Sequence, residues 1–326
     1  MLAFSVLVSQ PGWRDEADRW ILTSLQEAGL GPVGPQEQPR IRPWSTQQVV
    51  PTSGGRVWFK ANCPELSFVP ALQKLLARLA PGRVDTPIAV EDSRGWMLTW
   101  DRGETLAEPH EPTLAEWCEI VQEAGDVQRH AASAREQVLS TGVHDCSPET
   151  VPDRFDALLA RYAALEVEHP SHLTAGQLKQ FRAVRPAIVD AAAALEQSPL
   201  PATLNHGDLH PGNVLTVDGG LRLFDFGDAQ WAAAPEVLGA VWGWLTRRTD
   251  HPWRKVFAAY ADVWSDVVTS AEFDLLVAAA MVTLPVNRSL TWWSATRQTT
   301  TGELAEWGDM PLSMLSHVLL PWPGSP

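Results

Sequence analysis

The first hundred residues mix short extended patterns with helical ones. Apolar residues recur at helical spacing over residues 13–29 and 66–79, which predicts two helices. The run Ser53-Gly54-Gly55 predicts a hairpin turn. Shorter runs, bounded by turn residues, predict two extended segments over residues 41–51 and further ones at 56–61, 88–90 and 95–100.

From residue 114 onward helical spacing prevails, and one segment interrupts it. The interruption, residues 203–228, holds two short apolar runs, 214–217 and 221–224, joined by a turn. The break at Asp101-Arg102-Gly103 divides the chain into two predicted lobes, residues 1–102 and 103–326. Seven helices are predicted in the second lobe, near 114–135, 151–166, 174–196, 234–248, 253–268, 272–290 and 303–320.

Charge and cysteine content narrow the class of protein. The formal net charge of −14 argues against a chain that wraps nucleic acid, which needs a basic stripe against phosphate. Three cysteines at irregular spacing form neither a disulfide framework nor a zinc site, which favours the reducing cytoplasm. The longest apolar stretch, near 275–286, contains a proline and falls short of the ~20 residues of a membrane helix. We therefore expect a cytoplasmic protein without a nucleic-acid or membrane partner, and its oligomeric state stays open.

The interrupting segment, LNHGDLHPGNVLTVDGGLRLFDFGDAQ, carries the candidate chemistry. Asp208, in His206-Gly207-Asp208, precedes Asn213 by 5 residues and Asp225, in Asp225-Phe226-Gly227, by 17 residues. Either tripeptide alone recurs by chance in turn-rich segments. The two together, at this spacing and beside apolar strands, favour a catalytic loop followed by a metal-binding loop.

This combination resembles the catalytic and metal-binding motifs of the protein-kinase-like superfamily, and most of all the aminoglycoside phosphotransferase and choline kinase-like family. In protein kinases the loop is H-R-D-L-x-x-x-N. Here Gly207 replaces the arginine, and His210 takes the place of a lysine. The resemblance is tight over 203–228 and loose elsewhere. It implies an α+β, protein-kinase-like fold of two lobes, with a small β-rich N-lobe and a larger, mostly helical C-lobe.

The resemblance also implies roles for these residues. Asp208 accepts or orients the hydroxyl of the phosphate acceptor, and His206 braces the loop through hydrogen bonds rather than reacting. Asn213 and Asp225 hold Mg²⁺, a cation that prefers oxygen ligands and bridges nucleotide phosphates. The nucleotide is ATP, with GTP as the alternative.

Lys60 stands near the end of the RVWFKA strand and is the only lysine among the first 73 residues. The resemblance makes it the lysine that contacts the α- and β-phosphates. Its partner is open: either Glu65 fills the place of the usual helix glutamate, or the ion pair is absent, because the expected helix position is Val69. A glycine-rich phosphate loop is missing. At its place Ser45 and Thr46 either bond phosphate oxygens or only form a turn.

The GWMLTW strand and the following break match the hinge that holds the adenine, at Trp100 and Asp101. Trp96 and Leu98 either pack near the base or belong to the core. The acceptor site is expected on the helices after the metal motif, where acidic and aromatic side chains suit an aminated or sugar-like compound. The candidates are Asp228, Glu236, Trp292 and Glu303, with Trp242, Trp293 and Glu306.

The favoured interpretation is a kinase that transfers the γ-phosphate of ATP to a hydroxyl of a sugar, an amino sugar or an aminoglycoside-like molecule. Two alternatives remain from the sequence. One is a kinase of a peptide or of a natural-product intermediate. The other is a nucleotide-binding pseudokinase, which the absence of an acidic residue at Val69 favours and the intact Asp208, Asn213 and Asp225 oppose.

Overall fold

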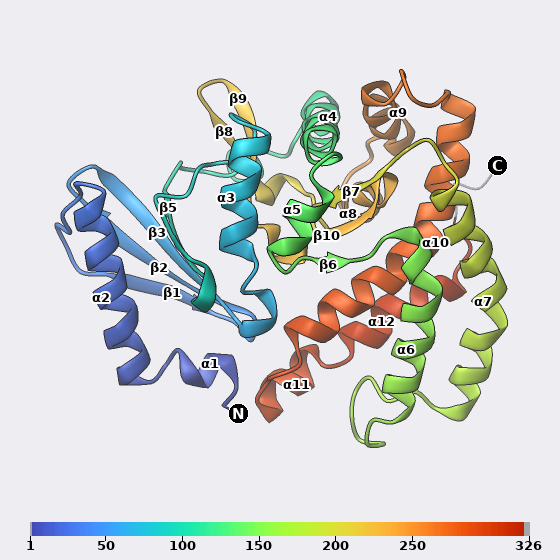
Figure 1. Ribbon diagram of the computed structural model, residues 1–326, viewed down its shortest axis with the longest axis horizontal. Helices are drawn as coiled ribbons and strands as arrows, with labels where there is room; N and C mark the ends of the chain where they lie inside the picture. The colour runs from blue at the N-terminus through green and yellow to red at the C-terminus, as the bar shows by residue number, and fades with distance from the viewer. Residues whose placement is uncertain (1, 323–326) are drawn as a thin grey trace.

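The computed structural model describes residues 2–322. Its N-terminal part is a five-stranded antiparallel sheet in the order β1-β2-β3-β5-β4 (Figure 1). Two main helices accompany the sheet, α2 (Pro11–Glu27) and α3 (Val69–Leu79), after a short α1 (Phe4–Leu7). The strands are β1 (Glu37–Ile41), β2 (Ser45–Thr52), β3 (Gly55–Asn62), β4 (Ala89–Glu91) and β5 (Trp96–Trp100).

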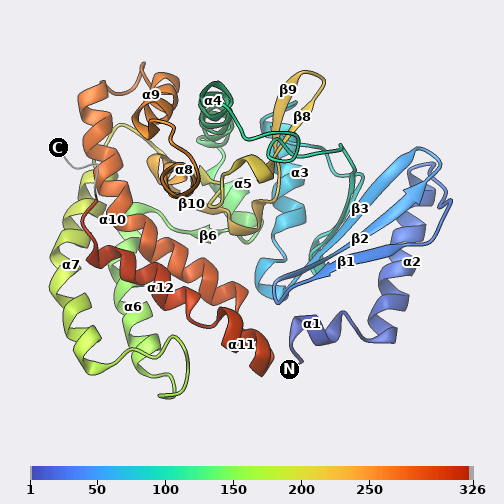
Figure 2. The ribbon, with the colours of Figure 1, turned by 180° about the vertical axis from the view of Figure 1, so that it is seen from behind.

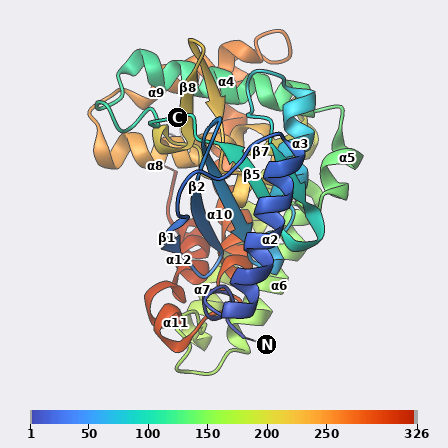
Figure 3. The same ribbon diagram turned by 90° about the vertical axis from the view of Figure 1, so that its left-hand side faces the viewer.

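The two faces of this sheet have different partners. On one face, Phe59 of β3 packs against Trp13 and Trp20 of α2, which lies across the sheet (Figure 3). Because side chains alternate along a strand, Trp58 and Lys60 point to the opposite face. That face looks toward the rest of the molecule, so β3 delivers its polar side chains to the space between the two parts.

The predicted elements of this half are largely confirmed, with one correction. Helix α2 ends before Gly29, which takes the left-handed φ of +72°. The segment 66–79, predicted as one helix, is a 3₁₀ turn at Pro64–Leu66 followed by α3, which begins at Val69 with Pro70 in its first turn. The two extended segments predicted over 41–51 correspond to the end of β1 and to β2; the polar start of β1 was not predicted.

The C-terminal part is mostly helical, and every predicted helix is present. One of them is divided, since the prediction near 303–320 covers α11 and α12. The prediction near 114–135 corresponds to α4, and the short α5 that follows it was not predicted. Threonine capping boxes begin α4, α7, α10 and α11. The helices are α4 (Leu114–Ala131), α5 (Arg135–Ser140), α6 (Val151–Ala163), α7 (Ala175–Glu196), α8 (Leu238–Arg248), α9 (Trp253–Val263), α10 (Ser270–Ala295), α11 (Thr301–Trp307) and α12 (Met310–Ser316).

Helix α10 corrects the sequence argument about membrane spans. The helix has 26 residues, and an 18-residue window within it has a mean hydropathy of 1.3, so by length and composition it could cross a membrane. The apolar stretch near 275–286 was instead predicted to be too short for that. Half of that window is buried. The helix packs against α6, α7 and α12 (Figure 2), so its apolar character has a partner inside the protein. Such a helix is weak evidence for a membrane span.

The interruption predicted at 203–228 is a set of short strands. The hairpin of β8 (Val214–Val217) and β9 (Gly220–Leu223) agrees with the prediction. A second small sheet, in the order β6-β10-β7, was not predicted. In it β10 (Gln230–Ala233) pairs with β7 (Ala202–Asn205) and β6 (His144–Asp145). Strand β7 ends just before His206 and β10 begins just after the metal motif, so their pairing anchors both ends of the segment.

Candidate active site

A cavity of about 600 Å³ lies between the N-terminal sheet and the motif segment. The sheet contributes Lys60 and Trp58 from β3, and the segment contributes Asn213 and Asp225. Residues 101–105, which connect the two parts, form another wall. Sequence positions more than 150 residues apart thus share one cavity, as the two predicted motifs require.

Gly207 allows the two motif loops to touch. It has a φ of +79°, and a Cβ atom at this position would lie 2.1 Å from the backbone oxygen of Asp228. Any side chain would therefore force the catalytic and metal loops apart. This contact explains why a glycine stands where protein kinases carry an arginine.

His206 supports the loop from inside. Its Nε2 atom lies 2.9 Å from the carbonyl oxygen of Phe224, and its Nδ1 atom accepts the N–H of Asp208 at 3.4 Å. The ring packs on Phe226 at 4.9 Å. Burial lowers the pKa of His206, which keeps the ring neutral and leaves Nε2–H as the donor. Its contacts are those of the bracing residue predicted from the sequence.

Asp208 combines an anchored backbone with an accessible carboxylate. The Asn213 side-chain amide donates to the carbonyl oxygen of Asp208 at 2.9 Å. The Asp208 side chain is 41% exposed, and its Oδ2 atom lies 3.5 Å from Nε2 of His210, whose ring stacks on Trp244 at 4.4 Å. Burial raises the pKa of Asp208, but His210 and the charge of Arg288 outweigh burial and lower it. The carboxylate is therefore ionised and can accept a hydrogen bond from a hydroxyl.

Asp225 and Lys60 form an ion pair across the cavity. The Lys60 Nζ atom lies 2.5 Å from Asp225 Oδ1, and the lysine side chain is 10% exposed. Asp225 follows β9 in the left-handed region, with φ of +61°. Burial raises its pKa, but the charge and hydrogen bond of Lys60, together with the charge of Arg40, lower it to about 2.

Of the two alternatives that the sequence left open, the pairing of Lys60 with Glu65 is not the one observed. Glu65 lies in the 3₁₀ turn before α3 and accepts a hydrogen bond from Gln298 at 3.0 Å. Val69 is fully buried in the core. The α3 side chain that lines the cavity is Gln73, one turn later; it donates to the carbonyl oxygen of Asp85 at 3.2 Å.

Ser45 and Thr46 do not occupy a phosphate loop. Both are buried at the start of β2, and neither lines the cavity. The Thr46 hydroxyl donates to the carbonyl oxygen of Arg40 at 3.0 Å and accepts from Gln38 at 2.8 Å. These hydrogen bonds hold the β1–β2 hairpin together and favour the turn-forming alternative over phosphate binding.

At the hinge, Trp100 and Asp101 both line the cavity. The Asp101 carboxylate pairs with Arg56 at 2.9 Å. Trp96 and Leu98 are buried instead, Trp96 against Trp13 and Trp20 of α2. Both are therefore core residues rather than part of a base-binding surface.

Comparison with known proteins decides the family. A sequence model described as the phosphotransferase enzyme family (APH) matches residues 62–271, most of the chain. The chain belongs to this family. It is therefore a small-molecule kinase, an enzyme that transfers phosphate to a hydroxyl group. A search of curated proteins found no match.

Solved structures show the fold that this phosphotransferase shares. An ethanolamine kinase from Plasmodium vivax has a TM-score of 0.65 at 11% identity, covering 94% of this chain and 88% of that one. A choline/ethanolamine kinase family protein from Mesorhizobium loti has a TM-score of 0.60 at 15% identity, covering 95% of each chain. A spectinomycin phosphotransferase in complex with ADP and spectinomycin has a TM-score of 0.52 at 9% identity, covering 93% and 97%. The protein-kinase-like two-lobe fold is thereby confirmed.

Two of the four main acceptor candidates in this phosphotransferase have structural roles instead. Glu236 is 1% exposed and accepts hydrogen bonds from Thr283 and Asn287 in the core. Burial raises its pKa to about 7. Glu303 accepts the backbone N–H of Thr300 at 2.8 Å in the capping box of α11. Neither carboxylate is placed to receive a substrate.

The other acceptor-site candidates lie in different parts of the protein. Asp228 lies beside Asp208 in the site, paired with Arg288 at 2.7 Å, and burial raises its pKa. Trp292 packs against Trp44 of the β1–β2 turn, with ring centroids 5.7 Å apart. Of the remaining candidates, Trp242 packs on Trp322, Trp293 packs on Tyr162 and His169, and Glu306 is exposed.

Arg288 was not among the predicted site residues, although its charge acts on both Asp208 and Asp228. A signal was available: Arg288 is the only basic residue among the 26 of α10. A lone arginine in an apolar helix needs a partner, and here that partner is Asp228. Trp244, which stacks on His210, carried no comparable signal.

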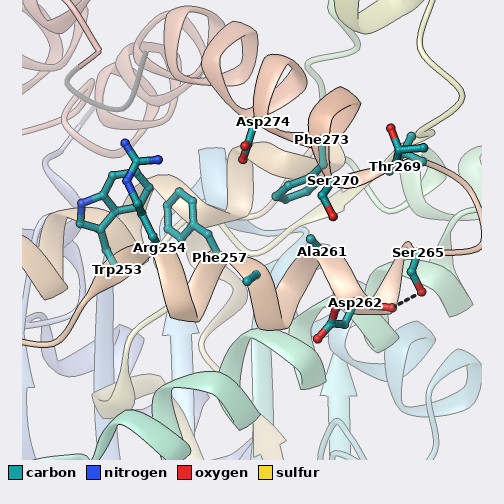
Figure 4. A pocket seen from close by; sticks show the side chains of 12 residues that line it. Trp253, Arg254, Phe257, Ala261, Asp262, Ser265, Thr269, Ser270, Phe273 and Asp274 are labelled. Atoms are coloured by element: carbon teal, nitrogen blue, oxygen red, sulfur yellow. Dashed lines mark hydrogen bonds between the residues drawn. The ribbon is translucent and has the colours of Figure 1, made fainter. Parts of the chain in front are cut away.

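A second cavity, of about 270 Å³, lies between α9 and the start of α10 (Figure 4). Trp253, Phe257 and Phe273 form its apolar part, and Asp262 and Asp274 lie at its edge. It contains none of the motif residues. The chemistry of this phosphotransferase is therefore assigned to the larger cavity.

Proposed function

We propose that this phosphotransferase moves the γ-phosphate of ATP to a hydroxyl of a sugar, an amino sugar or an aminoglycoside-like molecule. The observation that carries the proposal is the convergence of two motifs on one cavity. Asn213 and Asp225 line it opposite Lys60, and Asn213 is bonded to the backbone of Asp208. Phosphoryl transfer needs positioned groups and charge stabilisation more than covalent help from the protein.

The cavity is suited to a nucleotide. Trp58 and Met97 offer apolar surface for a purine, and Lys60, directly opposite Met97 in the sheet, offers a cation beside it. The similar spectinomycin phosphotransferase is a complex with ADP. We propose that the backbone after Trp100, near Asp101, contacts the base and that the small lobe ends at residue 102. Comparing ATP with GTP in binding measurements tests the choice of purine.

The residues present also fit Mg²⁺. Asp225 supplies a carboxylate, and Asn213 supplies an amide carbonyl, two hard oxygen ligands on neighbouring loops. Mg²⁺ usually takes only one or two carboxylates from the protein and fills its other positions with phosphate and water. When bound, it would neutralise negative charge on the phosphates. We propose Asn213 and Asp225 as the ligands.

Asp208 is proposed to accept the hydrogen bond of the acceptor hydroxyl and to orient its oxygen toward the phosphate. Its lowered pKa keeps the carboxylate ionised, and its 41% exposure leaves room for the acceptor. His206 holds the backbone of Asp208, and Arg288 with Asp228 supplies the polar wall beside it. We propose the cytoplasm, where ATP is abundant, as the compartment.

The test is ADP release by the purified protein over an acceptor panel. The panel holds monosaccharides, amino sugars, aminoglycosides including spectinomycin, choline and ethanolamine. Acceptor-dependent ADP release that requires Mg²⁺ supports the proposal, and the product's mass identifies the phosphorylated compound. Release that no acceptor stimulates, together with phosphorylation of added peptides, would contradict a small-molecule acceptor.

A further inference from the structure

The β1–β2 turn, where a glycine-rich phosphate loop would stand, is occupied by other contacts. Its residues are Arg42, Pro43 and Trp44. The Arg42 N–H donates to Ser45, Pro43 has no N–H to offer, and the Trp44 carbonyl accepts from Cys63. The Trp44 ring packs on Trp292 and Trp307, with centroid distances of 5.7 and 5.2 Å. None of these three residues lines the cavity, so this turn offers it no backbone amides for phosphate.

Arg40 lies on the cavity side of the same hairpin. It stands directly opposite Gln47 of β2, and Gln47 stands directly opposite Lys60 of β3. Residues opposite each other in a sheet point to the same face, and all three line the cavity. A second cation therefore shares the Lys60 end of the cavity.

Arg40 differs from the other two arginines that line the cavity, because both of those are paired with carboxylates. Arg56 is paired with Asp101 at 2.9 Å, and Arg102 with Asp85 at 2.9 Å. Across residues 2–322, the Arg40 guanidinium has neither an ion pair nor a hydrogen bond. An arginine without a carboxylate partner, facing a cavity in a chain of net charge −14, is available for an anion.

We propose that the Arg40 guanidinium binds the phosphate chain of the nucleotide, in place of the missing backbone loop. The assignment rests on the proposed function, since it needs a nucleotide in this cavity. A triphosphate carries more negative charge than one divalent cation neutralises, and Lys60 is already matched by Asp225. The planar guanidinium donates two parallel hydrogen bonds to phosphate oxygens, which an ammonium does not.

Calorimetric titration of Mg-ATP, Mg-ADP and adenosine into four proteins tests the assignment. These are the wild type, Arg40→Gln, Arg40→Lys and Arg78→Gln; the last has the same charge change at an exposed position of α3. A hydrogen bond to a charged group corresponds to about 10- to 100-fold in affinity. We expect R40Q to lose about that much for both phosphorylated ligands, R40K to lose less, and R78Q to match the wild type.

Binding of adenosine distinguishes the loss of a phosphate contact from a change in the shape of the cavity. It has no phosphate, so we expect its affinity to be equal in all four proteins. Unchanged Mg-ATP affinity in R40Q would overturn the assignment while the proposed function stands. An equal loss for adenosine in R40Q would overturn it too, because position 40 would then only support the shape of the cavity. If the wild type binds no nucleotide, the proposed function fails and the assignment fails with it.

Discussion

The Lys60 ammonium lies 2.5 Å from the Asp225 carboxylate, although 165 residues separate the two positions. The pair joins β3 of the N-terminal sheet to the loop after β9. It places a cation where phosphate is expected and holds a proposed metal ligand in a left-handed conformation. One ion pair thus links the two parts of the cavity before any ligand binds.

Lys60→Met should weaken nucleotide binding and also lower stability in a pH-dependent way. The pair depresses the pKa of Asp225 from 3.8 to about 2, so its stabilisation is present above the unfolded pKa and is lost as pH falls through about 2. After allowance for an Asp225 side chain that is 31% exposed, the pair contributes about 1–2 kcal/mol at pH 7.

Urea unfolding without nucleotide, at several pH values, measures this effect. The gap in unfolding free energy between wild type and K60M should narrow as pH falls from 5 toward 2. Lys74→Met, the same substitution at an exposed position of α3, serves as the control. A gap that is independent of pH would contradict the role of the ion pair.

Asp208→Asn should keep the fold and nucleotide binding but lose turnover. The substitution preserves shape and removes the charge that orients the acceptor hydroxyl, and loss of a positioned base typically costs ~10²–10⁴ in rate. Steady-state kinetics with the best acceptor of the panel give kcat. Asp218→Asn, at an 86% exposed carboxylate in the nearby hairpin turn, should leave kcat unchanged. Equal rates for D208N and wild type would remove Asp208 from the mechanism.

Asp225→Ala should abolish the Mg²⁺ dependence of nucleotide binding, because it removes the only carboxylate among the two proposed ligands. Asn213→Ala should weaken binding less, since one neutral oxygen is lost. The structure adds a second effect: Asn213 also donates to the backbone of Asp208, so N213A should lower kcat as well. Calorimetry at varied Mg²⁺, with kinetics beside it, checks both. Wild-type Mg-ATP binding in both variants would refute the metal assignment.

Val69→Glu should destabilise the protein by several kcal/mol, because the side chain is fully buried in the core and a carboxylate there would be unpaired. No gain in rate is expected, since Val69 does not line the cavity. The melting temperature measures the loss. Lys74→Glu, at an exposed site of the same helix, should have little effect. A faster, equally stable V69E enzyme would show that position 69 reaches Lys60.

Glu236→Gln should flatten the pH dependence of stability. Burial raises the pKa of Glu236 from 4.5 to about 7, so the neutral acid stabilises the fold fully below pH 4.5, and this contribution is lost as pH rises to about 7. The loss is on the order of 3 kcal/mol. Chemical unfolding of wild type, E236Q and the exposed-site control Glu306→Gln at pH 4.5, 6 and 7.5 tests this. The same slope in E236Q and wild type would contradict it.

Several features were predictable because they depend on neighbours in the chain. Helix α2 and the β8–β9 hairpin follow from apolar periodicity and from glycine or aspartate at turns. The motif spacing of Asp208, Asn213 and Asp225 was visible for the same reason, since the whole catalytic segment spans only 26 residues, 203–228. Local patterns thus indicated the fold class and the residues at the centre of the chemistry.

The partners of those residues were decided by tertiary structure. Lys60 pairs with Asp225 rather than Glu65, because the 3₁₀ turn before α3 carries Glu65 away to Gln298. Arg288 meets Asp228 only because α10 crosses behind the motif loops. A charged side chain is stabilised by whichever opposite charge the packing brings within a few ångströms, and that distance is a property of the assembled lobes, not of spacing along the chain.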